Sequence, residues 1–302
     1  MRYTRLPAGI ALVAAATVIL AGCATGNDTA GGDSTGAEKG TVTLGYLPSW
    51  TDSLSTSFLL KNQIEKLGYT VELQTLTEAG PLYTGLSEGD IDIYPSAWID
   101  VAQKGYWDRF SDDLEDLGAY YTEASGMLAV PSYVDIDSIA DLKGQGERFD
   151  GKIYTIEPGS GAATFAEESL LPFYGLDEEY DLVTSSTPAM LTVLQEAISK
   201  QEDIVVTLWR PFWVTDVFDI KELDDVDDGY GEPEGLHFIA HEEFSGEYPD
   251  AAELVSSITL DDEQYSTLEN MVVNEYGEGQ EAEAVEAWLA QYGDQLDWVV
   301  TG

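Results

Sequence analysis

The segment Ile204-Val-Val-Thr-Leu-Trp-Arg-Pro-Phe-Trp213 decides how the rest of the chain can be arranged. Its apolar run is short and lies between a helical segment and Pro211, a pattern typical of a buried parallel strand that ends in a loop. In open α/β sheets, ligands bind just beyond the carboxyl ends of such strands. Trp209 is therefore expected at a position where a ligand would be met.

The segments on either side alternate between strand and helix patterns. Besides the run from Ile204, strands are expected over 41–46, 71–76, 90–94, 126–131, 152–156 and 236–240. Helices are expected over 54–67, 81–87, 136–142, 188–200, 251–257, 261–274 and 281–292, with a further helix after the glycine turn 158–161. Ser53 or Asp52 can cap the first helix. This order predicts parallel strands joined by right-handed crossovers.

The alternation of strands and helices occurs twice, which predicts an α/β fold of two lobes joined by two crossovers. Lobe 1 is expected to comprise residues 41–131, and lobe 2 residues 132–236. Residues 237–302 are expected to return to lobe 1 and to pack C-terminal helices against it. A chain of 302 residues can bury one large core or two medium ones, which is compatible with this division.

The composition is strongly acidic, with 13 basic against 57 acidic residues and a net charge of −44. So few basic residues cannot neutralise phosphates, which excludes nucleic acid as a partner. An acidic surface keeps a protein hydrated in high salt, where screening makes the repulsion between like charges tolerable.

The first 23 residues have the pattern of an export signal. Arg2 and Arg5 precede an apolar run over 8–21 that is too short for a convincing transmembrane helix, and Leu20-Ala-Gly-Cys23 follows. This resembles a bacterial lipoprotein signal, in which the thiol of Cys23 is acylated; the alternative is an ordinary secretory signal with a chance cysteine. Residues 24–40 predict a flexible tether. The expected location is the extracytoplasmic face of the cell membrane, through a lipid anchor.

Three of the seven tryptophans follow predicted strands and lie in predicted loops, where a core does not require them: Trp50, Trp98 and Trp209. Trp288 and Trp298 have spacings that suit packing in a core. A cation over an indole gains about 0.5–2 kcal/mol per ring. Our hypothesis is that the three indoles meet in a cleft and hold a quaternary ammonium ion, a group that has no N–H to donate.

A glycine turn, Pro158-Gly-Ser-Gly161, opens a predicted helix. The amide N–H groups of such a turn point outward at the positive end of the helix dipole, which favours an anion. A small carboxylate can be bound there by the N–H groups of Gly161 and Ala162. The alternative is a plain strand-to-helix turn, in which the glycines only supply positive φ angles.

Five separated motifs resemble the glycine betaine/proline betaine-binding proteins of osmoprotectant ABC importers. The motifs are Tyr46-Leu-Pro-Ser-Trp-Thr-Asp52, Glu78-Ala-Gly-Pro-Leu-Tyr83, Ser96-Ala-Trp98, Pro158-Gly-Ser-Gly161 and Thr207-Leu-Trp-Arg-Pro-Phe-Trp213. The resemblance covers nearly all of residues 41–245. It implies a type II periplasmic-binding-protein fold that closes on its ligand and presents it to the permease and ATPase subunits of a transporter. A monomer is expected, and no cofactor.

The resemblance also implies roles for single residues. Trp50, Trp98 and Trp209 would form the aromatic box, and the amides of Gly161 and Ala162 would bind the ligand carboxylate.

Two positions depart from the family pattern. Family members often have a histidine five residues after the box tryptophan; Gln103 stands at that position here and can still donate through its amide. Phe212 stands where the family motif Trp-x-Pro-His-Trp has histidine. Arg210 occupies the variable position of that motif, where it would either bind the carboxylate or point to solvent.

Several alternatives remain open from the sequence alone. Choline, carnitine or ectoine belong to the same ligand class, and choline would not need the helix amides because it lacks a carboxylate. A secreted carbohydrate-active enzyme would use the tryptophans as sugar platforms and a carboxylate pair as catalyst, and a ligand-sensing module would need a fused effector. His237 and His241 have no serine or acid at a telling spacing, so no catalytic residue and no metal site is predicted.

Overall fold

The computed structural model describes residues 39–301, with the exception of the Asp216 side chain. The predicted export signal with Cys23, and the predicted tether as far as residue 38, lie outside these residues. Within the described part of the chain, no helix is both long and apolar enough to cross a membrane.

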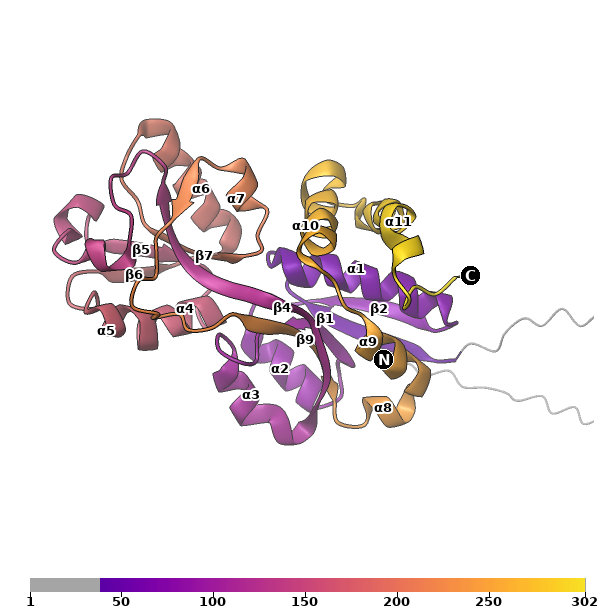
Figure 1. The fold of residues 1–302 in the computed structure, drawn as a ribbon. Coiled ribbons are helices and arrows are strands. Elements are labelled where there is room, and N and C mark those ends of the chain that lie inside the picture. The colour runs from indigo at the N-terminus through magenta and orange to yellow at the C-terminus, as the bar shows by residue number, and fades with distance from the viewer. Residues whose placement is uncertain (1–38, 302) are drawn as a thin grey trace, which may run out of the picture. The chain divides into compact units, whose positions relative to one another are not determined.

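The strands form one mixed sheet, in the order β2-β1-β3-β9-β4-β7-β5-β6, with β8 paired to β4 (Figure 1). Their bounds are β1 Thr41–Tyr46, β2 Thr70–Thr75, β3 Ile93–Ala97, β4 Leu114–Pro131, β5 Lys152–Thr155, β6 Asp181–Thr184, β7 Val206–Arg210, β8 Ile220–Glu222 and β9 Glu234–His241. The first three strands pair in parallel, as predicted for the β-α-β-α-β unit. Strands β5, β6 and β7 form a second parallel group.

Strand β4 is shared by two lobes. Its residues 114–124 pair with β9, and its residues 125–131 pair with β7 and β8. Strand β9 runs back antiparallel to both β4 and β3, which is the predicted return to the first lobe. The change of partner therefore occurs between Ala124 and Ser125, before the predicted boundary at residue 131, and the return begins at Glu234.

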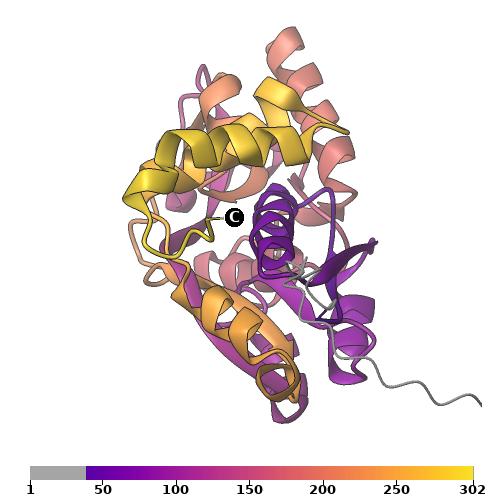
Figure 2. The ribbon, with the colours of Figure 1, turned by 90° about the vertical axis from the view of Figure 1, so that its right-hand side faces the viewer.

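Helices cover both lobes and have the following bounds: α1 Thr51–Lys66, α2 Ala79–Ser87, α3 Lys104–Phe110, α4 Gly161–Phe165, α5 Leu171–Tyr174, α6 Thr187–Lys200, α7 Val214–Val217, α8 Phe244–Glu247, α9 Pro249–Ser257, α10 Asp262–Asn270 and α11 Glu281–Tyr292. Two π-helical turns, 166–170 and 271–276, extend α4 and α10. Helices α10 and α11 pack against α1 of the first lobe, as predicted for the C-terminal helices (Figures 1 and 2).

Some predicted boundaries were wrong, for identifiable physical reasons. Helix α1 begins at Thr51 with Trp50 as its N-cap, not Ser53 or Asp52, because the Asp52 carboxylate is turned inward to other partners. Strand β3 begins at Ile93 rather than at residue 90, since the amides of Asp90 and Ile91 donate to the carbonyl of Gly85 in α2 (2.9 and 3.1 Å).

Three strands were missed: β4 in part, and β6 and β8 in full. Strand β4 extends back to residue 114 because its first half pairs with β9, although its polar residues hide it in the sequence. Strand β6 is short and half exposed, and it lacks the apolar run that marks a strand.

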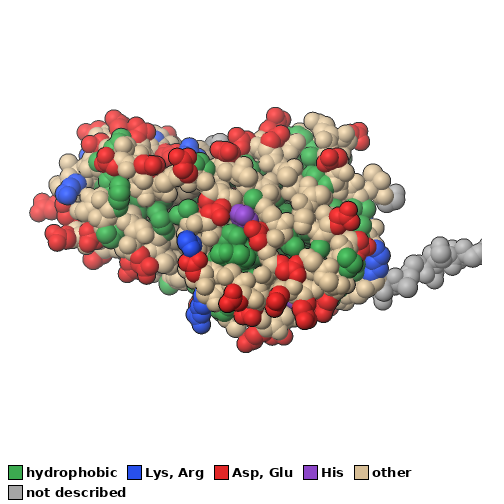
Figure 3. All heavy atoms as spheres, turned by 60° about the horizontal axis from the view of Figure 1, so that its bottom comes forward, with side chains coloured by type: hydrophobic (Ala, Val, Ile, Leu, Met, Phe, Trp, Pro, Cys, Tyr) green, Lys and Arg blue, Asp and Glu red, His purple; other side chains and the backbone are tan. Residues whose placement is uncertain are grey.

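Apolar side chains fill the interior as the sequence pattern requires. Trp288 is fully buried and Trp298 is 6% exposed, so both belong to the core, as predicted. Trp298 lies in a turn after the last helices rather than on a helix. The outer surface is acidic: Figure 3 shows Asp and Glu side chains spread over the face that it displays, with few Lys or Arg between them.

A tryptophan-lined pocket as the candidate binding site

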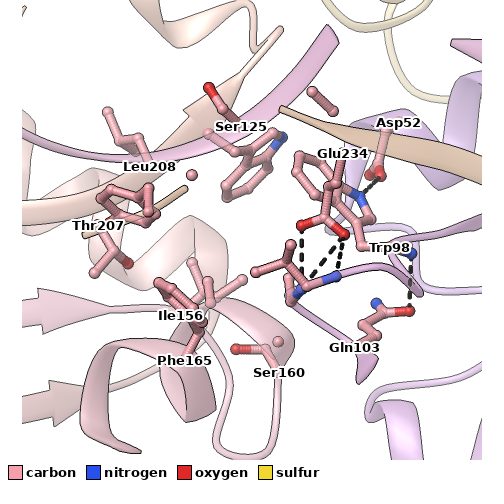
Figure 4. Close-up of a pocket in the computed structure, with 18 of the residues that line it drawn as sticks. Asp52, Trp98, Gln103, Ser125, Ile156, Ser160, Phe165, Thr207, Leu208 and Glu234 are labelled. Atoms are coloured by element: carbon pink, nitrogen blue, oxygen red, sulfur yellow. Dashed lines mark hydrogen bonds between the residues drawn. The ribbon is translucent and has the colours of Figure 1, made fainter. Parts of the chain in front are cut away.

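All six residues predicted to bind a ligand line one pocket between the two lobes: Trp50, Trp98, Gln103, Gly161, Ala162 and Trp209. They come from the loop before α1, the loop after β3, the start of α4, and β7. The segments that carry them are therefore far apart in the sequence and meet only in the fold. The lining is largely apolar and contains no lysine, arginine or histidine among the described residues (Figure 4).

The indole of Trp98 is fixed within its own lobe. Its Nε1–H donates to Asp52 Oδ2 at 2.9 Å (Figure 4). The hydroxyl of Ser96 donates to the same oxygen at 2.8 Å. Asp52 is 3% exposed, and this burial raises the pKa of its carboxyl group although the two side-chain hydrogen bonds act in the opposite direction. The buried carboxylate thus holds the ring of Trp98 as one wall of the pocket.

Trp50 forms a second wall, and its partner lies on the other lobe. As the N-cap of α1 it is held by the turn in which its amide donates to the carbonyl of Leu47 (3.0 Å). Its Nε1–H donates to Glu157 Oε2 at 3.1 Å, and Glu157 follows β5 of the second lobe. The indole is 5% exposed.

Trp209 forms the third wall from within a strand, not from a loop as predicted. Strand β7 continues through Arg210 because Gly126 and Ser125 of β4 pair with its last two residues. The Trp209 ring stacks on Phe212 with centroids 4.0 Å apart. Its Nε1 is buried and has no hydrogen-bond partner among the described residues, so the ring is held by apolar packing, including the stack on Phe212.

Arg210 does not line the pocket. Its guanidinium is more than half exposed and contacts Glu222 Oε1 at 3.2 Å and Ser125 Oγ at 3.4 Å. The choice left open by the sequence is therefore decided in this structure: Arg210 lies at the surface beside a carboxylate rather than in the binding cavity.

The start of α4 lies at the pocket as predicted. Ser160 is the N-cap: its hydroxyl accepts the amide N–H of Ala163 (3.2 Å), and its carbonyl accepts that of Thr164 (3.0 Å). The N–H groups of Gly161 and Ala162 precede these and have no partner within the helix. The carboxylate of a ligand in the pocket can accept hydrogen bonds from these two N–H groups.

Gln103 lines the pocket, but much of its hydrogen-bonding capacity serves the protein. Its Oε1 accepts from the hydroxyl of Tyr83 (2.9 Å) and from the amide of Trp98 (3.3 Å), and its Nε2 donates to the hydroxyl of Tyr94 (3.2 Å). One side-chain N–H remains for a ligand. Gln103 thus fixes the backbone that carries Trp98 (Figure 4).

A carboxylate that sequence reasoning missed also lines the pocket. Glu234, at the start of β9, accepts the amide N–H of Val101 (2.9 Å) and that of Ala102 (3.1 Å), on the loop after Trp98 (Figure 4). Burial raises the pKa of Glu234 to about 7, although both hydrogen bonds act against this rise. No local signal marks this residue among 57 acidic ones; only its place two residues before the predicted return strand could have pointed to it.

Comparisons with known proteins agree with this geometry. A model of the family described as the substrate binding domain of ABC-type glycine betaine transport systems matches residues 40–291. The glycine betaine/carnitine transport binding protein GbuC of Listeria monocytogenes is 31% identical over 157 residues, which are 51% of this chain and 50% of that relative. The match thus spans about half the length of that curated relative.

Solved structures are similar over most of their length. The glycine betaine, L-proline-binding protein ProX of Borrelia burgdorferi is 32% identical, with a TM-score of 0.78 over 86% of this chain and 96% of its own. Lactococcal OpuAC, in a closed conformation with glycine betaine, is 26% identical, with a TM-score of 0.77 over 86% of this chain and 99% of its own. The two-lobed periplasmic-binding-protein fold implied by the motifs is confirmed.

Proposed function

Because the chain belongs to the family of substrate-binding domains of ABC-type glycine betaine transport systems, we propose that it captures glycine betaine or a closely related quaternary ammonium compound and delivers it to a permease. Members of this family are transport binding proteins and not enzymes. For this chain the proposal is saturable binding without turnover, which also separates it from a carbohydrate-active enzyme.

The observation that carries the proposal is the meeting of Trp50, Trp98 and Trp209 in one pocket. A trimethylammonium group cannot donate a hydrogen bond, so its recognition depends on electron-rich faces and on excluding water. Each desolvated indole face contributes about 0.5–2 kcal/mol to binding a cation. Three faces would therefore supply several kcal/mol without a direct ion pair.

The carboxylate of the ligand is assigned to the start of α4. The N–H groups of Gly161 and Ala162 face the pocket end of the helix, where the helix dipole favours a negative charge. Gln103 would contribute its remaining N–H beside them. These three groups would give the site its preference for a zwitterion over a simple cation.

Choline is the second candidate, and a specific observation favours it. Three carboxylates line the pocket, from Asp52, Glu232 and Glu234, and no cationic side chain among the described residues balances them. A ligand that is purely cationic would gain from this negative potential without facing it with a carboxylate of its own.

We also propose the cellular setting. Acylation of Cys23 would anchor the protein to the extracytoplasmic face of the membrane, residues 24–40 would act as the tether, and the protein would work as a monomer with the permease and ATPase subunits. Lobe 1 would comprise residues 41–131 together with 237–302, and lobe 2 residues 132–236. The crossover strand β4 would add its residues 125–131 to the sheet of lobe 2, where they pair with β7 and β8.

Titration calorimetry with glycine betaine, choline and carnitine, in molar salt, tests the function. Saturable binding of glycine betaine by the wild-type protein, weakened strongly in Trp98→Ala and in Trp209→Ala, is expected. Binding that survives both substitutions unchanged would refute the tryptophan site. Tighter binding of choline than of glycine betaine would make choline the ligand.

A further inference from the structure

Glu157 is buried between the lobes and is hydrogen-bonded on both sides. Its carboxylate accepts the amide N–H and the hydroxyl of Thr187, each at 3.0 Å, within its own lobe. It also accepts the hydroxyl of Ser49 and the indole Nε1–H of Trp50, each at 3.1 Å, from the other lobe. Only 8% of the residue is exposed. A single carboxylate thus joins the two halves of the fold beside the pocket.

The contacts within the second lobe stabilise a negative charge on the Glu157 carboxylate. Thr187 is the first residue of α6, a helix of 14 residues, so the carboxylate lies at the positive end of a long helix. These two hydrogen bonds involve only the second lobe and do not depend on the position of the first. Glu157 is therefore anchored in advance, with further acceptor capacity turned toward Ser49 and Trp50.

The three pocket indoles differ in what holds their N–H groups. Trp98 donates to Asp52 in its own lobe, and Trp209 has no partner among the described residues. Only Trp50 donates to an acceptor on the opposite lobe. A buried indole N–H that loses its acceptor is costly, so the orientation of the Trp50 ring depends on how the lobes are placed.

From this arrangement we propose that Glu157 is a positioning residue that couples closure of the lobes to the orientation of Trp50. This rests on the proposed function, because the ring that Glu157 orients is a wall of the proposed ammonium site. When the lobes separate, the carboxylate keeps Thr187 and releases Trp50. When they close, the bond to Nε1 locks the ring against the ligand, which slows ligand release.

A second contact between the lobes serves as a matched control. The hydroxyl of Tyr106, on α3, donates to the carbonyl of Gly159 at 2.9 Å. This bond also crosses between the lobes, two residues from Glu157, but it does not involve a pocket tryptophan. Tyr106→Phe removes it and leaves the three indoles in place.

The test is a double-mutant cycle on ligand dissociation, measured by stopped-flow tryptophan fluorescence with glycine betaine and with choline as probes. Glu157→Gln is expected to raise the dissociation rate about tenfold or more, because a charge-assisted bond across the lobes is lost. Trp50→Phe keeps an aromatic face and removes the N–H donor together with part of the ring. In that background the effect of Glu157→Gln should largely disappear.

The controls make the outcomes distinct. Tyr106→Phe should have the same effect in the wild-type and in the Trp50→Phe background, because it acts independently of the ring. An effect of Glu157→Gln that is equally large in both backgrounds, or no effect in either, would overturn the inference.

Two further results guard the interpretation. If Glu157→Gln unfolds lobe 2 by weakening the bonds to Thr187 at the start of α6, Ser49→Ala replaces it, since it removes a donor to Glu157 and leaves Thr187 untouched. Failure of the wild-type protein to bind either probe would overturn the proposed function and this inference with it, whereas binding without coupling would overturn the inference alone.

Discussion

Gly161 is the position at which one added methyl group tests both closure and the binding site. A Cβ atom built there would lie 2.5 Å from the carbonyl oxygen of Ala102 and 2.7 Å from its carbonyl carbon, across the gap between the lobes. Ordinary contact begins at 3.4 Å, so the shortfall is about 0.9 Å (3.4 − 2.5) against backbone atoms that cannot rotate away. In Gly161→Ala the lobes would have to stay apart by about this distance.

The size of the effect follows from the usual cost of overpacking, about 1–3 kcal/mol. Since 1.4 kcal/mol corresponds to a tenfold change in affinity, Gly161→Ala should weaken ligand binding by about 5- to 150-fold. The ligand-free protein should unfold at nearly the wild-type temperature, because opening the lobes relieves the clash and alanine is the better helix former by about 1 kcal/mol.

Titration calorimetry and thermal unfolding of the same samples measure both quantities. Gly105→Ala is the matched control, since Gly105 lies in the first turn of α3 and its added Cβ would meet no atom within 4 Å. Wild-type affinity in Gly161→Ala would refute the claim that the lobes close onto this contact. A large fall in the unfolding temperature without ligand would show that the substitution damages the fold instead.

Three further changes have defined outcomes. Burial raises the pKa of Glu234 to about 7, so its carboxyl group is largely protonated below that pH. A bound cation favours the ionised form, so the affinity measured by calorimetry should rise between about pH 6 and pH 8. Glu234→Gln should abolish this dependence of affinity on pH. The same rise in pKa means that Glu234 contributes stability that is full below about pH 4.5 and is lost as the pH rises through about 7, so the unfolding temperature of ligand-free Glu234→Gln should vary less over this range. Asp52→Ala removes the acceptor that fixes Trp98 and should weaken ligand binding about tenfold or more in fluorescence titrations. Ser96→Ala removes the second side-chain donor to the Asp52 carboxylate but keeps the acceptor for Trp98, so its effect on binding should be smaller. Trp288 is fully buried and does not line the pocket, so Trp288→Ala should destabilise the protein by about 3–5 kcal/mol in urea unfolding and leave the affinity of the folded fraction unchanged.

The walls of the pocket could be predicted from sequence because local chemistry marks them. Trp50 and Trp98 stand where a strand gives way to a loop, and Gly161 opens a helix after a glycine turn. These signals are contained in a few neighbouring residues. The rule that ligands bind beyond the carboxyl ends of strands then brings the marked positions together without knowledge of any single contact.

The residues that hold the walls could not be found in the same way. The bond between Trp50 and Glu157 joins positions 107 apart, and that between Trp98 and Asp52 positions 46 apart. A carboxylate that accepts an indole N–H has the same sequence signature as the many that face solvent. Strand β4 was predicted only from residue 126 for a related reason: its polar first half is a strand because β9 pairs with it, not because of its own pattern.

The acidic surface and the pocket act over different distances, which explains how they coexist. A net charge of −44 attracts the ammonium group of a zwitterionic betaine and repels its carboxylate, so the two effects nearly cancel at long range, and salt limits the field to about 10 Å at 0.1 M and about 3 Å at 1 M. Inside the pocket, the carboxylates of Asp52 and Glu234 are occupied by N–H groups of the protein, and burial raises the pKa of both. Two of the three carboxylates in the lining are thus engaged within the protein, and the indoles add faces whose attraction for a cation depends on direct contact. Such contacts are shielded from bulk ions, so recognition should persist at the salt concentrations that screen the charges of the acidic surface.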